Sequence, residues 1–285
     1  MKIYKHHVVF SLPIMLLVQL AATTQQQIPT GSSPLVTSPR PLADAARRLQ
    51  EAYGKVVTYE EPILTWRGEL EAKPGRDPEG KWELFPKVQA FFMPTESRPG
   101  TDLASLLENT VAAYHQQTSG TRFQLLSSPL GYHIVPVQVH DENGRFVATT
   151  SVLDQIVTVP SEARSAMQHL RALGAAISSR GPIRIDISAV RGKARGFDTA
   201  FRAQPDVFPW GAYSAVARDA LVDLLNQSAT TFFWHLNCQA SAQASDRFCA
   251  LNVGAIEVAV TDSQGKPAKR VLWYDRCRDC PPEIH

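Results

Sequence analysis

The order of helices and strands that the sequence predicts from residue 41 onward occurs twice, and this repeat limits the possible folds more than any other feature. A helix is predicted from Pro41, because apolar residues recur at helical spacing up to Tyr53 and Gly54 then ends the run. A comparable helix, which we expect Ser161 to cap, follows roughly 120 residues later. The predicted helices and strands of the first pass are residues 41–53, 56–59, 63–70, 88–93, 101–120, 123–126 and 132–139; those of the second are residues 156–159, 161–177, 183–187, 214–224, 231–238 and 248–260. In the first pass we expect Thr101 to cap the second helix.

Two amphipathic helices and several strands in each pass predict an α+β fold. We expect two tandem small modules, residues 41–150 and 151–285, in which the helices pack on a mixed or antiparallel sheet. The second module ends in a predicted β-meander, because residues 253–260 and 270–274 flank a turn signal and the strand at 231–238 precedes them.

The first 24 residues have the pattern of a secretory signal peptide. Lys2 and Lys5 form a charged start, residues 8–22 are mostly apolar, and small residues follow. The apolar run is shorter than the roughly 20 residues of a membrane-spanning helix; an uncleaved N-terminal anchor is the alternative. Residues 25–40 are rich in Gln, Ser, Thr and Pro, so we expect a flexible polar tether there. These features predict a periplasmic or secreted protein.

The charge balance excludes one class of partner. The net charge is +2, and loss of Lys2 and Lys5 with the signal peptide leaves equal numbers of basic and acidic residues. A surface without excess charge argues against nucleic acid or an anionic membrane as the main partner.

All four cysteines lie near the C-terminus, and an even number in an exported chain predicts disulfides. If the strands at 231–238 and 248–260 form a hairpin centred near residues 243 and 244, Cys238 lies opposite Cys249. We therefore predict the pairs Cys238–Cys249 and Cys277–Cys280. The alternative joins Cys249 to Cys280 and leaves Cys238 to reach Cys277.

The spacing of Cys277 and Cys280 is also compatible with chemistry. A Cys-x-x-Cys pair can cycle between dithiol and disulfide, or bind a metal. Pro281 and Pro282 follow directly, so no helix can begin there to lower the pKa of a cysteine. The pattern therefore favours a structural disulfide over a redox or metal site.

No other motif indicates a catalytic residue, a cofactor or a metal, and we expect none of these. The histidines of the predicted fold are not spaced as metal pairs; the four considered are His115, His133, His169 and His235. Glu60 and Glu61 are adjacent, so on a strand they point to opposite faces and cannot form a catalytic dyad; we expect a solvated strand end. The tryptophans form either core or an aromatic face for peptide or sugar; they are Trp66, Trp82, Trp210, Trp234 and Trp273.

Four segments carry a resemblance to a known family. They are residues 42–59, residues 103–118 followed by 123–126, residues 156–173, and residues 220–234 with their helix followed by Thr231-Phe-Phe-Trp. Their apolar pattern resembles the secretin and TonB short N-terminal (STN-like) domain in two tandem copies, as in a family of exported proteins of soil bacteria. The resemblance implies a small periplasmic α+β module that makes protein–protein contacts in secretion pores or transport receptors.

The expected function is therefore an exported, non-enzymatic protein-interaction module of the cell envelope. We expect an exposed sheet edge to bind a strand of an envelope protein, with no nucleic acid and no stable membrane span after signal cleavage. One alternative is an envelope thiol–disulfide protein that uses Cys277 and Cys280. Another is a peptide- or sugar-binding protein that uses exposed aromatic residues.

Overall fold

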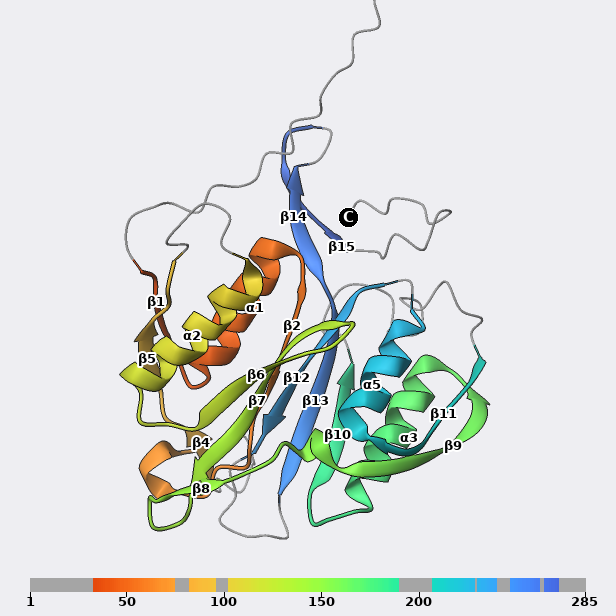
Figure 1. The fold of residues 1–285 in the computed structure, drawn as a ribbon, viewed down its shortest axis with the longest axis horizontal. Helices are drawn as coiled ribbons and strands as arrows, with labels where there is room; N and C mark the ends of the chain where they lie inside the picture. The colour runs from red at the N-terminus through yellow and green to blue at the C-terminus, as the bar shows by residue number, and fades with distance from the viewer. Residues whose placement is uncertain are drawn as a thin grey trace, which may run out of the picture. The chain divides into compact units, whose positions relative to one another are not determined.

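The computed structural model describes residues 33–74, 82–95, 102–189, 207–228, 230–239, 247–261 and 264–271. Within these residues the fold is α+β, with four α-helices and both mixed and antiparallel sheets (Figure 1). The predicted signal peptide, Trp273, Cys277 and Cys280 lie outside the described residues.

The four helices begin and end at residues with recognisable capping roles. They are α1 (Pro41–Tyr53), α2 (Leu103–Gln117), α3 (Ala166–Ser178) and α5 (Ala217–Asn226). Gly54 ends α1 in the left-handed conformation, with φ of 60°, which glycine adopts at little cost. Two predicted caps were wrong. Asp102, rather than Thr101, accepts the Ser105 N–H at the start of α2. Ser165, rather than Ser161, caps α3 in a capping box with Gln168.

Most of the strands belong to one mixed sheet. Its order is β10 (Arg184–Ala189), β13 (Phe248–Ala255), β12 (Phe232–Cys238), β2 (Val56–Glu60), β7 (Gly131–His140) and β6 (Arg122–Ser127), with β8 (Phe146–Ala148) also paired to β7. The pairs β10–β13, β12–β2 and β2–β7 are parallel. The pairs β12–β13, β6–β7 and β7–β8 are antiparallel. Figure 1 shows β12 and β2 side by side where the N-terminal and C-terminal parts of the sheet meet.

Four two-stranded ribbons complete the fold. They are β1 (Leu35–Ser38) with β5 (Gln89–Phe92), β9 (Ile156–Arg164) with β11 (Phe208–Val216), β3 (Leu70–Pro74) with β4 (Trp82–Pro86), and β14 (Glu257–Thr261) with β15 (Pro267–Val271). Short 3₁₀ turns occur at Arg67–Glu69 and Val152–Asp154.

These ribbons correct several sequence-based expectations. Leu35–Ser38, the end of the expected tether, is strand β1, because it pairs with β5 and buries Val36. The strand expected at 63–70 is extended coil and a 3₁₀ turn, with β3 beginning only at Leu70. β9 continues to Arg164 because β11, which was not predicted, pairs along it. The β14–β15 hairpin forms its own sheet instead of extending the β12–β13 hairpin into a meander.

The same pairing pattern occurs in the two halves of the described chain. In the first half, β2 runs parallel and β6 antiparallel to the central strand β7. In the second half, β10 runs parallel and β12 antiparallel to the central strand β13. A helix lies between the corresponding strands in sequence in each case, and β1–β5 corresponds to β9–β11.

The helices of the two halves cover opposite faces of the main sheet. Successive residues of a strand point to opposite faces. On β2, Val57 belongs to the core cluster of α1 and α2, whereas Val56 belongs to the core cluster of α3 and α5. The two halves therefore share one sheet, and each buries its own helix pair on a different side of it.

Candidate functional site

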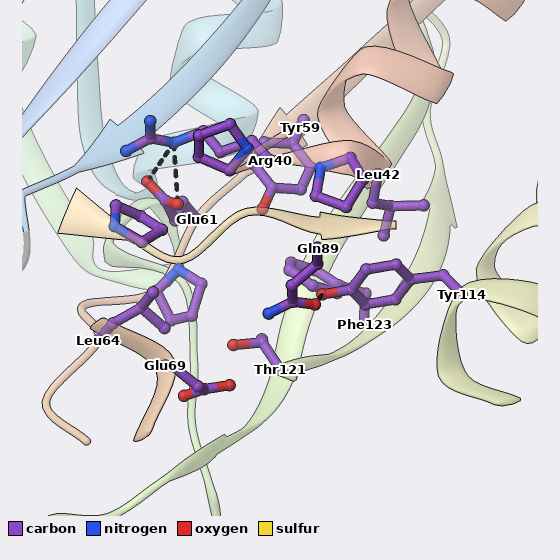
Figure 2. Close-up of a pocket in the computed structure, with 14 residues that line it drawn as sticks. Arg40, Leu42, Tyr59, Glu61, Leu64, Glu69, Gln89, Tyr114, Thr121 and Phe123 are labelled. Carbon is purple, nitrogen blue, oxygen red and sulfur yellow. Dashed lines mark hydrogen bonds and ion pairs between the residues drawn. The ribbon is translucent and has the colours of Figure 1, made fainter. Parts of the chain in front are cut away.

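A small pocket lies between the start of α1 and the end of β2 (Figure 2). Its polar lining comes from segments far apart in sequence: Arg40, Tyr59, Glu61, Glu69, Gln89, Tyr114 and Thr121. The cavity volume is about 20 Å³, which is room for about one water molecule. This pocket is therefore too small for a substrate-sized organic ligand.

Glu61 lines this pocket and is buried, with only 3% of its surface exposed. Arg40 Nε lies 2.9 Å from both carboxylate oxygens, and the Cys238 N–H donates to Oε2 at 2.9 Å. Burial raises the pKa of Glu61, while Arg40 and the Cys238 N–H act in the opposite direction. The expected solvated strand end is wrong, because tertiary contacts cover this carboxylate and give it partners.

Glu69 and His140 form a buried carboxylate–histidine pair near the same pocket. Glu69 Oε1 lies 3.2 Å from His140 Nδ1. The His140 ring lies 4.5 Å from the ring of Trp66 and 4.0 Å from that of Phe146, centroid to centroid. Burial raises the pKa of Glu69, and the neighbouring histidine lowers it in part. No spacing in the sequence indicated this pair, because Glu69 ends a 3₁₀ turn and His140 ends β7, far apart in the chain.

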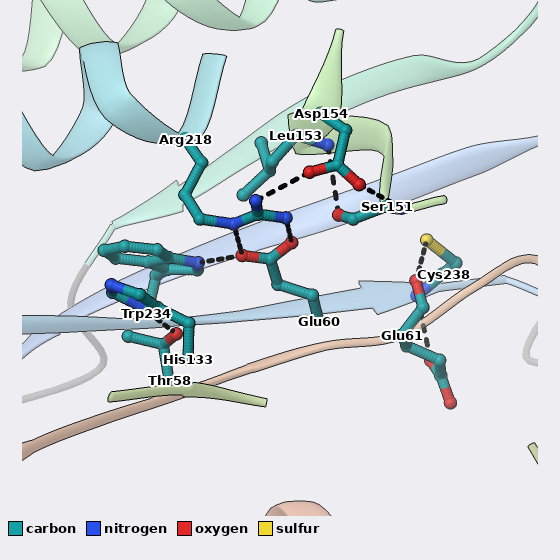
Figure 3. Close-up of polar contacts among 10 residues, drawn as sticks. All are labelled: Thr58, Glu60, Glu61, His133, Ser151, Leu153, Asp154, Arg218, Trp234 and Cys238. Atoms are coloured by element: carbon teal, nitrogen blue, oxygen red, sulfur yellow. Dashed lines mark hydrogen bonds and ion pairs between the residues drawn. The ribbon is translucent and has the colours of Figure 1, made fainter. Parts of the chain in front are cut away.

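Glu60 is fully buried on the opposite face of β2 and pairs with Arg218 of α5 (Figure 3). The guanidinium donates to both carboxylate oxygens, Nε to Oε1 at 2.8 Å and Nη2 to Oε2 at 2.7 Å. Its third nitrogen, Nη1, donates to Asp154 Oδ1 at 2.6 Å. Burial by itself lowers the pKa of Arg218, but the bonds and charges of Glu60 and Asp154 raise it overall. Here too the expectation of a solvated carboxylate is wrong.

The network continues through Trp234 and His133. Trp234 Nε1–H donates to Glu60 Oε1 at 3.3 Å, and its ring stacks on His133 at 4.9 Å between centroids. His133 is bonded at both ring nitrogens, with Thr58 Oγ1 at 2.8 Å and Ser128 Oγ at 2.7 Å. Burial, followed by the charge of Arg218, lowers the pKa of His133 to about 4.

This network joins the two halves of the sheet. Glu60 and His133 come from the first half, whereas Arg218 and Trp234 come from the second. Each charged group has a partner within the protein, and Glu60 has no exposed surface that a substrate could reach. We conclude that the network has a structural role, which satisfies buried charges at the β12–β2 pairing.

The other histidines considered in the sequence, His115, His169 and His235, form no common site in the part of the chain that the structure describes. His169 bonds to the Phe208 carbonyl oxygen through Nε2 at 2.8 Å, and His115 Nε2 accepts the Phe123 N–H at 2.9 Å. Burial lowers the pKa of His235 to about 4. Within the described residues, no three His, Cys, Asp or Glu side chains gather as metal ligands.

The tryptophans whose side chains the structure describes, Trp66, Trp210 and Trp234, do not share one exposed face. Trp234 is fully buried and Trp210 is 5% exposed, and Trp210 Nε1–H donates to Asp223 Oδ2 at 2.9 Å. Trp66 is half-buried against His140. The structure therefore assigns Trp210 and Trp234 to the core.

Cys238 and Cys249 form a disulfide between β12 and β13, as the hairpin register predicted. The two residues are direct partners in the antiparallel pairing, and both side chains are buried. The second predicted pair, Cys277–Cys280, lies outside the described residues.

Replacing both Cys238 and Cys249 with alanine should lower the free energy of unfolding by roughly 2–3 kcal/mol, because the unfolded chain then loses its loop constraint. Urea unfolding of the oxidised protein and the variant measures the difference. Wild-type protein unfolded in the presence of a reductant should approach the stability of the variant. Equal stability of the oxidised wild type and the variant would contradict this estimate.

A larger open groove runs between α3 and the edge strand β10. Its volume is about 420 Å³, and it is lined by Arg171, Ala175, Arg184, Ile185, Asp186 and Ile187. Among the described strands, β13 is the only neighbour of β10 in the sheet. The sequence predicted this strand but not that it would form the edge.

The backbone groups of β10 alternate between its neighbour and the groove. The Arg184 N–H donates toward β13, to the Arg247 carbonyl oxygen at 3.1 Å. The next N–H, of Ile185, points away from β13 and donates to Ser178 Oγ at 2.8 Å. Because parallel strands bond through every second residue, the peptide groups of Ile187 also face away from β13. Because Ser178 occupies the Ile185 N–H, the groups of this edge that a further strand could bond are those of Ile187.

Comparison with known proteins found no matching family model, no matching curated protein and no matching solved structure. Within the described residues, no helix has both the length and the apolar character needed to cross a membrane.

Proposed function

We propose that this chain is an exported, non-enzymatic protein-interaction module of the cell envelope, periplasmic or secreted, which binds an extended segment of a partner protein along β10. The observation that carries this proposal is the groove between α3 and β10, next to a sheet edge on which the peptide groups of Ile187 face away from β13. Strand addition uses such an edge for main-chain hydrogen bonds, and the adjacent groove provides room for side chains.

The chemistry around the groove suits a peptide. Ile185 and Ile187 provide an apolar floor next to α3, and the side chain of Ile187 packs over Gly174 of that helix. Arg184 and Asp186 form an exposed pair on the strand, with Nη2 and Oδ2 3.1 Å apart. An apolar floor with charged residues beside it favours an extended segment of alternating apolar and polar residues.

Two further parts of the proposal concern architecture and location. The repeated pairing around β7 and β13 supports two tandem modules, and it is compatible with the STN-like resemblance. The N-terminal sequence pattern supports export, and the Cys238–Cys249 disulfide is typical of proteins in oxidising compartments.

The pairing of the buried acids supports a non-enzymatic role. Glu60 binds Arg218, Glu61 binds Arg40, and Glu69 lies against His140. A general acid or base must be within reach of its substrate. These three carboxylates instead pair with basic side chains inside the protein.

A photo-crosslinking residue in place of Asp186 should form an adduct with a partner in cells that export the protein. The exposed side chain of residue 186 borders the groove, and its ion pair contributes little to stability. The same residue at Glu108, on the exposed side of α2, should form no such adduct. Gel mobility and mass spectrometry of the adducts provide the measurement.

Ile187→Pro in the Asp186 variant should abolish the adduct, because proline removes the N–H that faces the free edge. Ile187→Ala, which keeps this N–H but removes the apolar side chain, should retain most of it. Circular dichroism of the purified variants checks that both remain folded. Adducts that persist with proline, or that form equally at Glu108, would contradict strand addition at β10.

A further inference from the structure

We propose that the segment bound along β10 is strand β6 of a second copy of this chain, so that copies associate head to tail through a continuous sheet. This inference rests on the proposed function and names the occupant of the same edge. It is carried by a pairing that the chain already makes within itself, between β12 of the second half and β2 of the first.

The β12–β2 pairing is parallel and joins the edges of the two halves. His235 lies opposite Tyr59, and Leu236 lies opposite Glu60. The Glu61 N–H donates to the Leu236 carbonyl oxygen at 2.9 Å. In this way the antiparallel outer strand of one half binds the parallel outer strand of the other.

The main sheet ends at β10 on one side and at β6 on the other. These two strands are the counterparts of β2 and β12, the strands that pair between the halves. β10 has in the second half the position that β2 has in the first, beside the central strand and parallel to it. β6 has in the first half the position that β12 has in the second. Among the described strands, β10 and β6 each have a neighbour on one side only. A second copy can therefore repeat the β12–β2 pairing with β6 and β10.

The register of this contact follows from the register of the central strands. Val56 pairs with Gly131 as Arg184 pairs with Phe248, so Ile187 corresponds to Tyr59. The pair Ser127↔Tyr132 of the β6–β7 hairpin is equivalent to the pair Cys238↔Cys249 of the β12–β13 hairpin. By this correspondence Gln124 takes the place of His235, and Leu125 that of Leu236. Gln124 of one copy should therefore lie opposite Ile187 of the next.

The backbone phase of β6 agrees with this register. At the β6–β7 turn, the backbone N–H of Ser128 donates to the Gly131 carbonyl oxygen and the N–H of Gly131 donates to that of Ser128. In an antiparallel pair every second residue bonds to the neighbouring strand, so the peptide groups of Leu126 and Gln124 also face β7. The peptide groups of Leu125 therefore face the free side of β6. Leu125 corresponds to Leu236, whose carbonyl oxygen is the acceptor in the β12–β2 pairing. The groups that the contact requires are those that point away from the sheet.

The geometry also determines the kind of assembly. The β12–β2 pairing places the helices of successive halves on opposite faces, so a second pairing of the same kind restores the first orientation. Copies then associate head to tail through a heterologous contact, to which further copies can be added at each end. Ser188 stands at the position of Glu60, so this contact lacks the Glu60–Arg218 ion pair. We expect it to be weaker than the internal pairing and dependent on concentration.

The test uses two single variants of the full chain, Gln124→Cys and Ile187→Cys, and a short bismaleimide cross-linker. The mixture of both variants should yield a peptide that links residues 124 and 187, identified by mass spectrometry independently of the native cysteines. Neither variant alone should yield 124–124 or 187–187 links. Links between like residues, or no 124–187 link at the highest soluble concentration, would overturn the inference.

Light scattering of the unmodified protein provides a second measurement that needs no cysteine variant. The average mass should rise with concentration toward twice the monomer mass or more, and Leu125→Pro should keep it at the monomer value. A mass that stays monomeric at every concentration would overturn head-to-tail association. If the Asp186 adduct then contains a different protein, the proposed strand addition still holds; if no adduct forms either, both proposals fail.

Discussion

Replacing Arg218 with methionine should lower the free energy of unfolding by about 3–5 kcal/mol, the largest effect that we expect from a single substitution in this protein. Glu60 has no exposed surface and receives two hydrogen bonds from the guanidinium. Without Arg218, its charge remains buried, and the donor left to it among the described residues is the Trp234 N–H at 3.3 Å. Breaking a buried ion pair by removing one partner has this cost because the other charge stays uncompensated.

Urea unfolding at neutral pH measures this effect, with Arg47→Met as the matched control. Arg47 also pairs with two acids, but its side chain is 49% exposed and its pairs are on the surface. We expect the control to change stability by less than about 1 kcal/mol. The double variant Glu60→Gln, Arg218→Met should recover part of the loss, since it removes both charges. An Arg218→Met loss no larger than the Arg47→Met loss would contradict a structural role for the network.

The second large effect is a loss of stability as the pH falls from about 6.5 to about 4. Burial and Arg218 lower the pKa of His133 to about 4, whereas an unfolded histidine titrates near 6.5. Between these values the unfolded state binds a proton that the folded state does not, so protonation favours unfolding. The stability is fully present above about pH 6.5, and His133 alone should account for a loss on the order of 3 kcal/mol by pH 4.

The variant His133→Gln isolates this contribution. Glu61 and Glu69 have raised pKa values in the folded protein, so they add stability as the pH falls and partly offset the histidine. The difference between wild-type and variant unfolding curves, measured from pH 7 to pH 4, removes these shared contributions. The variant should lose less stability over this range. Parallel curves for the two proteins would show that His133 does not stay neutral in the folded state.

Segments with strong local signals were predicted well from the sequence. Pro41 and Gly54 bound α1 because proline favours the first turn of a helix and glycine the left-handed end. The β12–β13 hairpin and its disulfide followed from alternation along two strands, which sets the register that brings Cys238 opposite Cys249. In each case the relevant residues lie within a short stretch of chain.

The predictions failed where a distant segment determines the local structure. β9 runs on to Arg164 because β11 pairs with it, and the serine that looked like a helix cap, Ser161, is inside the strand. Leu35–Ser38 is a strand because β5 lies beside it, although its composition resembles a tether. A strand needs a partner for its backbone hydrogen bonds, and the partner's identity is not encoded in the strand itself.

The carboxylates at the end of β2 show the same limit for the candidate site. The alternation of Glu60 and Glu61 to opposite faces was correctly read from the sequence, because it is a property of any strand. Whether each side chain meets water or an arginine depends on α5 and on the segment before α1, which only folding brings to β2. Likewise, β10 and β6 were recognisable as strands, but their places at the two ends of the sheet follow from the β12–β2 pairing between halves. Periodicity is local, whereas burial and sheet order arise from contacts between residues far apart in the chain.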